Sequence, residues 1–207
     1  MTVAPLLDAG HPDALARAAA VLRDGGAVVL PTDTVYGVAA LPSVPGATEQ
    51  LFALKQRSDR QPLAVLVADA AQAASLVAPP APDVARWMAE LWPGPLTIVL
   101  ARSGAALDLE LGGDRATIGM RCPALDVLRA LADLVGPIAT TSANRHGHPT
   151  PTTAAEAADA LAGDVALVLD GGPCDGMPST VVDAATRVWR VLREGPVEAD
   201  RLGPPPA

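Results

Sequence analysis

Apolar residues recur at helical spacing in some segments of the chain and form short continuous runs in others. The first pattern predicts helices and the second predicts buried strands. The N-terminal helical pattern, which ends at Asp24-Gly25-Gly26, predicts a helix over 12–23. Its apolar positions are Leu15, Ala18, Ala19 and Leu22. A short Val-rich run over 27–30 then predicts a buried strand that opens into the polar turn 31–34.

The same two patterns continue to the C-terminal region. Helices are predicted over 47–55, 69–77, 83–91, 124–134 and 154–161. Strands are predicted over 63–67, 96–101, 117–121, 137–141, 165–169, 180–183 and 188–192. Because strands and helices alternate, and the last strands are spaced like hairpins, we expect an α/β domain with a twisted, mixed parallel and antiparallel sheet flanked by helices. No linker or fixed-period repeat divides the chain, so we expect one domain over 1–200 and a flexible, proline-rich tail over 201–207.

Composition narrows the class of protein. With 50% hydrophobic and 18% charged residues, the 207-residue chain can bury a large core, which excludes disorder over its whole length. No apolar run approaches the ~18 residues that a membrane span needs, and no basic start precedes an apolar stretch. Cys122 and Cys174 are 52 positions apart without a zinc-binding pattern. We therefore expect a cytoplasmic protein with reduced thiols and no membrane contact.

Charge further limits the binding mode. The 15 basic and 23 acidic residues give a net charge of −8, which argues against affinity through general neutralisation of a phosphate backbone. Any anion that the protein binds must therefore be held at a local site. The skewed composition also makes rare residues visible, because Lys55 is the only lysine, Tyr36 the only tyrosine, Phe52 the only phenylalanine and Asn144 the only asparagine. Codon bias is the ordinary explanation for the rest of the skew.

Two candidate sites come early in the chain. The turn Pro31-Thr32-Asp33-Thr34-Val35-Tyr36-Gly37 follows a buried strand and offers hydroxyls, a carboxylate and backbone N–H groups, although a capped turn would look similar. The segment 55–62 contains Lys55, Arg57, Arg60 and Gln61. Charged helix ends are usually only solvated. The sole lysine nevertheless suggests that a compact ammonium is needed there.

Two more candidates lie in the C-terminal half. The strand over 137–141 leads into Ser142, Asn144 and a loop that reaches Thr152. The loop histidines His146 and His148 lack the partners of a metal site, and no G-x-S-x-G motif surrounds Ser142, so polar ligand recognition fits best. Strand ends also carry basic and hydroxyl side chains that could form an anion clamp, namely Arg121, Ser179, Thr180 and Arg193. Neither a Walker phosphate loop nor a dinucleotide-binding fingerprint occurs.

Seven strings in order, PTDTVYG, LKQRSDRQPLAVLV, LWPGPLTIVL, TIGMRCP, TTSANRHGHPTPT, PSTVVD and RVLREGPV, resemble the YrdC-like family of threonylcarbamoyl-AMP synthases. The resemblance runs from about Leu30 to about Val197. It implies a YrdC-like fold and a nucleotidyltransferase that joins L-threonine, bicarbonate or CO₂ and ATP, with Mg²⁺ on the phosphates, and releases pyrophosphate. The product would serve tRNA threonylcarbamoyl transferase proteins that modify adenosine 37 in ANN-decoding tRNAs. Direct contact with tRNA is not required.

The resemblance also implies residue roles. Catalytic positions would be Lys55, facing the phosphates or the carboxylating centre, and Arg57. Threonine would be held by Thr34, Arg121, Ser142, Ser179 and Thr180, and the nucleotide by Arg57, Gln61, Thr117, Asn144, Thr152 and Arg193. No protein metal ligand is implied. The carbamate and the mixed anhydride that this reaction would form both hydrolyse easily. We therefore expect a deep, largely closed groove that excludes water, with the sheet as its floor.

The chain departs from the family pattern in three places. The usual K-G-R-P is replaced by Lys55-Gln56-Arg57-Ser58, and Leu66 stands where some members carry His. Longer members add a C-terminal domain that 207 residues do not accommodate, so another element would have to close the site. Two alternatives remain open: a module of the same fold that binds tRNA or structured RNA without chemistry, and a paralogue that acts on another amine or carbamoyl compound.

Overall fold

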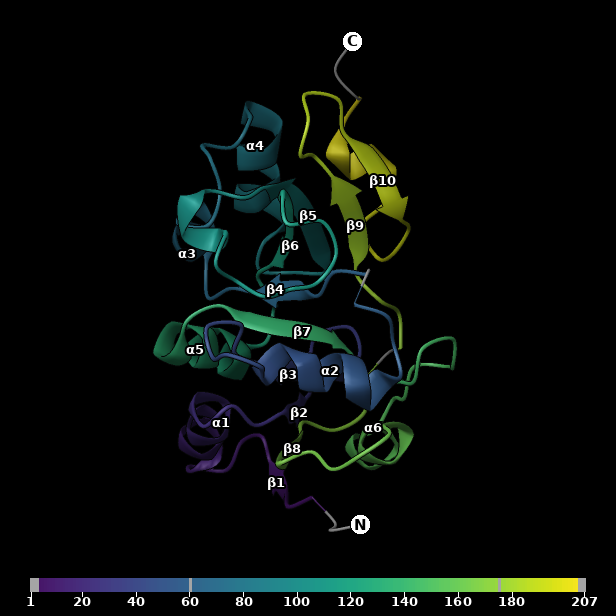
Figure 1. Cartoon of the computed structure of the whole chain (residues 1–207). Coiled ribbons are helices and arrows are strands. Elements are labelled where there is room, and N and C mark those ends of the chain that lie inside the picture. The colour runs from purple at the N-terminus through teal and green to yellow at the C-terminus, as the bar shows by residue number, and fades with distance from the viewer. Residues whose placement is uncertain (1–3, 60, 175, 205–207) are drawn as a thin grey trace.

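The computed structural model describes residues 4–59, 61–174 and 176–204. Within them, ten strands form one sheet in the order β1-β8-β2-β3-β7-β4-β6-β5-β9-β10. The strands are β1 (Leu6–Asp8), β2 (Val28–Leu30), β3 (Gly37–Ala40), β4 (Ala64–Leu66), β5 (Leu96–Ala101), β6 (Thr117–Arg121), β7 (Ile138–Ser142), β8 (Leu167–Asp170), β9 (Thr180–Asp183) and β10 (Arg190–Arg193). Figure 1 shows the sheet running from β1 at the bottom of the molecule to β10 near the top.

Six α-helices pack around this sheet in the described part of the chain. They are α1 (Ala14–Arg23), α2 (Ala47–Lys55), α3 (Ala70–Ala74), α4 (Pro82–Leu91), α5 (Asp126–Val135) and α6 (Ala154–Ala160), with short 3₁₀ turns η1 (Gly104–Ala106) and η2 (Ala199–Leu202). β8 pairs in parallel with β1 and β2, as do β4 with β6 and β5 with β9. The other neighbours are antiparallel. The predicted mixed α/β sheet is confirmed.

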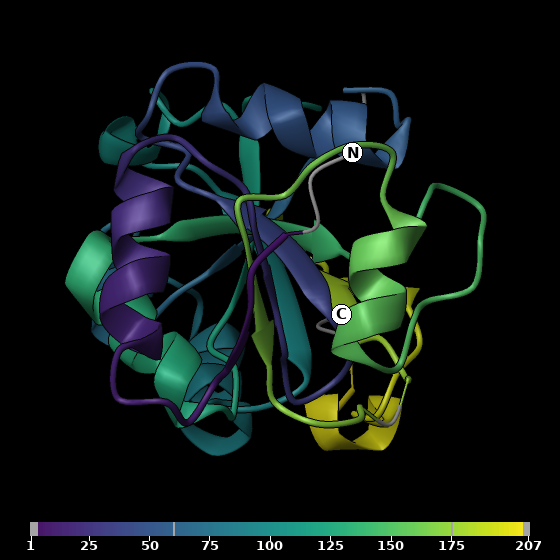
Figure 2. The ribbon, with the colours of Figure 1, turned by 90° about the horizontal axis from the view of Figure 1, so that it is seen from below.

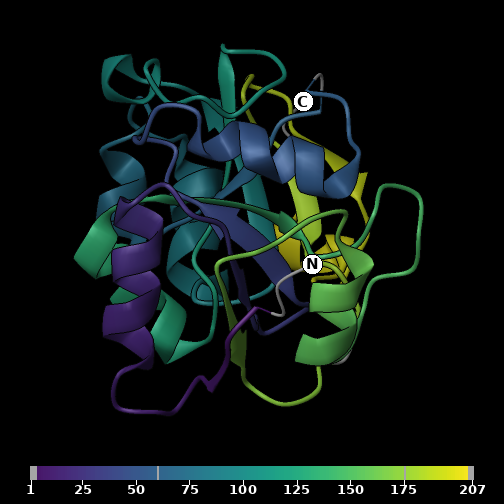
Figure 3. The ribbon, with the colours of Figure 1, turned by 60° about the horizontal axis from the view of Figure 1, so that its bottom comes forward.

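The helices divide between the two faces of the sheet. Leu22 of α1 and Leu131 of α5 are fully buried on one face, against Val28, Ala39 and Ile138 of the strands. These two helices lie side by side at the left of Figures 1 and 2. Figure 3 shows α6 on the other side of the strands from α1.

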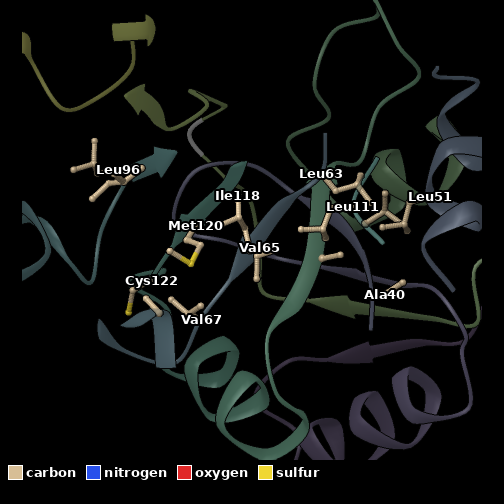
Figure 4. Packing of buried hydrophobic residues seen from close by; sticks show 14 of the residues in the cluster. Ala40, Leu51, Leu63, Val65, Val67, Leu96, Leu111, Ile118, Met120 and Cys122 are labelled. Atoms are coloured by element: carbon tan, nitrogen blue, oxygen red, sulfur yellow. The ribbon is translucent and has the colours of Figure 1, made fainter. Parts of the chain in front are cut away.

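The second face carries the larger core. Apolar residues of α2, α4 and α6 pack against alternate strand residues there, because successive side chains of a strand point to opposite faces. Figure 4 shows Val65, Ile118 and Met120 along the strands of this core, with Leu51 of α2 near Leu63. All five are almost fully buried, so this face provides most of the apolar burial that stabilises the sheet.

The first face is covered only in part. Where α1 and α5 end, strand alternation brings small or hydroxyl-bearing residues to the surface of the sheet, including Gly37, Ala64, Thr97, Gly119 and Thr140. A Cβ atom at Gly37 would lie 2.9 Å from the Thr140 Oγ1, so this close approach requires glycine. The uncovered area of the sheet becomes the floor of a groove.

The structure corrects several sequence predictions. β1 and β3 were not predicted, since β1 is a three-residue edge strand and the sequence Gly-Val-Ala-Ala of β3 has weak strand propensity. β9 and β10 form the expected hairpin, but β8 and β9 do not, because they lie at distant positions in the sheet.

The predicted start of the loose tail is also wrong at Leu202. This residue is 1% exposed in η2, and its carbonyl accepts a hydrogen bond from the Trp87 indole at 3.0 Å. The last three residues of the tail, 205–207, lie outside the described residues, as does Arg60.

Tyr36 is a core residue, although its rarity favoured a functional interpretation. Its ring faces the larger core, and its hydroxyl donates to the Gly172 carbonyl (2.6 Å) and accepts from the Gly171 N–H (3.1 Å). Burial is the main cause that raises its pKa to about 12.

We expect Tyr36→Phe to lower the free energy of unfolding by about 1–3 kcal/mol, because the partners of a buried hydroxyl would lose their hydrogen bonds. Urea denaturation measures the effect. Thr186→Val, which removes an exposed hydroxyl bonded to the Val188 carbonyl, is the control and should change stability by less than about 0.5 kcal/mol. Equal effects of the two variants would contradict a structural role for Tyr36.

Candidate functional site

A groove of about 260 Å³ lies over the uncovered area of the sheet. Its floor comes from β3, β4, β5, β7 and β9, and its walls from the turn after β2, the end of α2 and the segment before β9. The described lining residues are Thr32, Thr34, Val35, Gly37, Arg57, Pro62, Ala64, Leu66, Thr97, Arg121, Thr140, Thr141, Ser142, Pro178, Ser179, Val181 and Arg193. The expectation that the sheet forms the floor is confirmed.

The turn over 31–36 is stabilised by its own hydroxyls. The Thr32 Oγ1 accepts from the backbone N–H groups of Thr34 and Val35 (both 3.1 Å) and donates to the Val35 carbonyl (2.7 Å). Such side-chain bonds hold a tight polar turn in one conformation. In this conformation the Thr34 hydroxyl contacts Arg121 at the end of β6.

Arg121 is the most constrained cation of the groove. Its Nε donates to the Gly94 carbonyl (3.1 Å), its Nη1 to the Thr34 Oγ1 (2.7 Å), and its Nη2 forms an ion pair with Asp33. Burial lowers its pKa most, while the Asp33 carboxylate acts in the opposite direction. A guanidinium has five N–H groups, so one N–H on each terminal nitrogen remains for a ligand.

Arg57 reaches the groove because of the way α2 ends. Gln56 adopts a left-handed conformation (φ 51°), and the N–H groups of Gln56 and Arg57 bond back to the carbonyls of Ala53 and Phe52, which is a Schellman motif. Glycine, the usual residue of the family pattern, favours this conformation, and Gln56 retains it. The turn directs the Arg57 Nη1 to the Thr141 Oγ1 at 2.9 Å. Burial lowers the Arg57 pKa.

A third cation lies at the opposite wall. Arg193 of β10 donates through Nε to the Ser179 carbonyl (3.0 Å) and through Nη2 to the Ser179 Oγ (3.2 Å). The Ser179 Oγ also bonds to the Thr97 Oγ1 at 2.8 Å. Arg57, Arg121 and Arg193 therefore converge on one groove from three separate segments, which is an arrangement that can hold anionic groups.

Lys55 lies behind the groove and not in its lining. Its ammonium donates to the backbone carbonyls of Ser142 and Asn144 and to the Asn144 Oδ1 (3.1 Å), and the residue is 3% exposed. Burial, and then the charge of Arg57, lower its pKa to about 8. The structure thus places Lys55 under the turn that carries Ser142, and not facing the groove as predicted.

Asn144 is part of the same buried network. Its Oδ1 accepts from the Ser142 Oγ (2.6 Å), and its Nδ2 donates to the carbonyls of Arg145 (3.1 Å) and His148 (2.6 Å). It fixes the loop that follows β7 instead of lining the groove. His146 and His148 are exposed on this loop, as expected.

Some of the predicted site residues line the groove and others do not. Those that line it are Thr34, Arg57, Arg121, Ser142, Ser179 and Arg193. Thr180 does not, because alternation along β9 turns it to the opposite face, where its hydroxyl bonds to the Val197 backbone. Gln61 is exposed outside the lining, Thr117 lies at the other end of β6 from Arg121, and Thr152 bonds to Glu156.

Sequence reasoning gave no role to several residues of the site, among them Asp33 and Thr97. Asp33 pairs with Arg121, and its carboxylate was noted only as one polar group of the turn. Thr97 joins Ser179 through its hydroxyl. A hydroxyl within the otherwise apolar strand over 96–101 was the available signal, because an inward polar side chain in a strand needs a partner.

The segment from β8 to β9 passes along one wall of the groove. In Figure 1 it climbs from the lower part of the sheet to the upper part. The Cys174 N–H bonds to the Thr152 carbonyl (2.8 Å), the Gly176 N–H to the Thr34 carbonyl (3.3 Å), and Pro178 lines the groove. Pro178 and Ser179 are the described residues of this segment that line the groove.

Neither a metal cluster nor a membrane span is found in the part of the chain that the structure describes. No group of three His, Cys, Asp or Glu side chains there is arranged to hold a metal ion. No described helix is long and apolar enough to cross a bilayer. Cys122 is a buried free thiol.

A family model named for Sua5, YciO and YrdC, and described as telomere recombination, matches residues 20–195. The chain belongs to this family. The match covers the groove and every cation that lines it, in agreement with the resemblance of the motifs.

Curated relatives of this chain include threonylcarbamoyl-AMP synthases. The Bacillus subtilis protein of that name is 37% identical over 91% of this chain, and the human one is 36% identical over 84%. This chain spans 55% of the length of the former and 64% of the latter. A Mycobacterium tuberculosis relative is 38% identical over 89% of this chain and 85% of its own length.

Solved structures show the same fold. Pyrococcus abyssi Sua5, crystallised with L-threonine, superimposes with a TM-score of 0.88 at 31% identity over 97% of this chain and 60% of its own. Escherichia coli YciO gives a TM-score of 0.84 at 26% identity over 96% of this chain and 97% of its own.

Proposed function

We propose that the groove synthesises L-threonylcarbamoyl-AMP from L-threonine, bicarbonate or CO₂ and ATP, and releases pyrophosphate. The protein would be a nucleotidyltransferase, and its product would pass to tRNA threonylcarbamoyl transferase proteins for the modification of adenosine 37. The relatives that carry this name, and the threonine complex of a structural neighbour, support the proposal.

The arrangement of Arg121 is the observation that carries the proposal. Its two remaining N–H groups suit a carboxylate, and hydroxyls of Thr34, Ser142 and Ser179 line the same groove. Threonine has a carboxylate and a hydroxyl to match these groups. Arg57 and Arg193 remain for the charges of a triphosphate.

The proposed chemistry brings two anions together. The amine of threonine attacks the carbon of CO₂ and loses a proton, which gives an N-carboxylate. An oxygen of this carboxylate attacks the α-phosphorus of ATP, the bond to the β-phosphate oxygen breaks, and pyrophosphate leaves. The three arginines would lower the repulsion between the anions and fix their orientation without covalent participation.

In this scheme Mg²⁺ would bind together with ATP. No carboxylate is among the described lining residues of the groove, and Asp33, which adjoins two of them in sequence, is already paired with Arg121. The metal would therefore be held by phosphate oxygens and water, where it would neutralise charge on the leaving pyrophosphate.

We expect purified protein with Mg²⁺ and ATP to release pyrophosphate only when both threonine and bicarbonate are present. A coupled phosphate assay measures the rate, and mass spectrometry identifies the adenylate. Protein heated to unfolding is the control. Release no greater than in the absence of threonine would overturn the proposal, and release with another amine in its place would favour the paralogue.

Filter binding tests the RNA-binding alternative. The net charge of −8 and the burial of Arg121 argue against a protein that grips an RNA backbone. Tight, steeply salt-dependent RNA binding without adenylate formation would favour that alternative.

A further inference from the structure

Arg193 reaches the groove from the last strand of the sheet, because the pairing of β10 with β9 is irregular. Val191 opposes Val182, and Arg193 opposes Val181, so Leu192 is an extra residue in β10. Val181 lines the groove, whereas Val182 is buried in the larger core. Since opposing residues share a face of the sheet, the extra residue turns Arg193 to the groove, and strict alternation would have given it the face of Val191.

The guanidinium of Arg193 has one anchor in the described structure, which is Ser179. Its Nε donates to the Ser179 carbonyl (3.0 Å) and its Nη2 to the Ser179 Oγ (3.2 Å). No described carboxylate lies within ion-pair distance of it. Burial is the largest cause that lowers the pKa of Arg121, and the charge of Arg193 acts in the same direction. Arg193 therefore brings an uncompensated charge to the groove, which suits an anionic ligand.

Thr97 holds the hydroxyl of Ser179. The Oγ atoms of the two residues lie 2.8 Å apart, and this is the one hydrogen bond of the Thr97 hydroxyl within the described structure. Thr97 is 6% exposed in β5, which pairs with β6 on one side and with β9 on the other. Valine has a similar branched shape and suits a strand as well. The contact that the Thr97 hydroxyl adds leads through Ser179 to Arg193.

We propose that Thr97 is a positioning residue, whose hydroxyl fixes the Ser179 hydroxyl so that Arg193 stays directed at an anionic group of the ligand. The inference rests on the proposed function, in which Arg193 would meet the triphosphate of ATP. Thr97 acts through the other two residues and not on the ligand itself. Its removal should therefore weaken nucleotide binding only while Arg193 is present.

Calorimetry with a non-hydrolysable ATP analogue and Mg²⁺ measures nucleotide binding without turnover. Thr97→Val should raise the dissociation constant about 5-fold or more, as the loss of one hydrogen bond allows. Arg193→Met, which keeps the apolar stem without the guanidinium, should raise it by at least as much. Adding Thr97→Val to Arg193→Met should change it by less than about 2-fold, because the anchor then has no cation to hold.

Three further variants control the experiment. Thr97→Ser keeps the hydroxyl and should bind within about 2-fold of the wild type. Ser179→Ala removes the same link from its other side, so it should weaken binding, and it covers the case that Thr97→Val does not fold. Thr186→Val is the matched control, because Thr186 lies in the turn between β9 and β10 and its hydroxyl bonds to the Val188 carbonyl. It should bind the analogue as the wild type does.

Effects of Thr97→Val and Arg193→Met that multiply in the double variant would show that Thr97 acts independently of Arg193, and would overturn the proposal. Unchanged affinity in Thr97→Val, or a wild type that does not bind the analogue, would overturn it too. Failure of the proposed function is a separate result, since it consists of absent pyrophosphate release with threonine and bicarbonate and leaves the binding constants measurable.

Discussion

Arg121→Lys should lower kcat/KM for threonine by about 100-fold or more, with most of the loss in KM for threonine and little change in KM for ATP. Arginine meets the Gly94 carbonyl, the Thr34 hydroxyl and the Asp33 carboxylate and keeps two N–H groups for the ligand. A lysine ammonium has three donors at one point, so it cannot serve these partners and a substrate carboxylate together.

Steady-state kinetics with each substrate varied in turn measures the effect. Arg190→Lys is the matched control, because Arg190 makes an exposed ion pair with Asp183 at 3.2 Å, and an exposed pair contributes little. It should leave both KM values unchanged. An Arg121→Lys enzyme with normal KM for threonine would place the amino acid elsewhere in the groove.

Lys55→Met should lower turnover at least about 100-fold and the free energy of unfolding by about 3 kcal/mol. Methionine matches most of the apolar part of the lysine chain but leaves the Ser142 and Asn144 carbonyls without this donor, and it removes one of the two donors to the Asn144 Oδ1. The turn would then loosen, and Ser142, which lines the groove, would lose its position.

Kinetics and urea denaturation on the same preparation measure the two effects. Gln56→Ala, at the exposed neighbouring position, is a control for changes at the end of α2. Full turnover in Lys55→Met would mean that the only lysine of the chain is an accident of composition.

The pH dependence gives a second readout for Lys55. Because its pKa is lowered to about 8, the ammonium loses its proton near pH 8 in the folded protein but only near 10.5 when unfolded. Turnover should therefore decline above pH 8 as the turn loses one donor. Over the same range the unfolded state binds more protons, so stability relative to Lys55→Met should rise. A parallel fall of activity and of this relative stability would contradict the assignment.

The local patterns of the sequence were sufficient for most elements. Periodicity and apolar runs identified the helices α1, α4 and α5 and the strands β2 and β4, but they did not identify β1 and β3. β2 and β4 have only three residues, but they lie within continuous apolar runs. β1 is an edge strand without such a run, and the Gly-Val-Ala-Ala of β3 has weak strand propensity, so the formation of these two strands depends on their partner strands.

The rare residues lie in segments that contribute to the groove, but their own side chains do not line it. Tyr36, Lys55 and Asn144 all adjoin the groove in sequence, yet each side chain is buried in a network that supports it. Rarity in a biased composition indicates a strict requirement, and a strict requirement arises from a buried hydrogen-bond network as readily as from a ligand. Thr180 shows a related limit, because a shift of one residue along a strand changes the face.

The sequence by itself determined the family, the α/β class and six of the groove residues, because motifs and periodicity are local properties of the chain. Only the tertiary structure decided that Asp33 pairs with Arg121, 88 positions away, and that Lys55 supports a turn 87 positions away. Such contacts depend on strand order and on which face each side chain takes. Both are fixed by packing over the whole sheet, and neither is written in a local pattern.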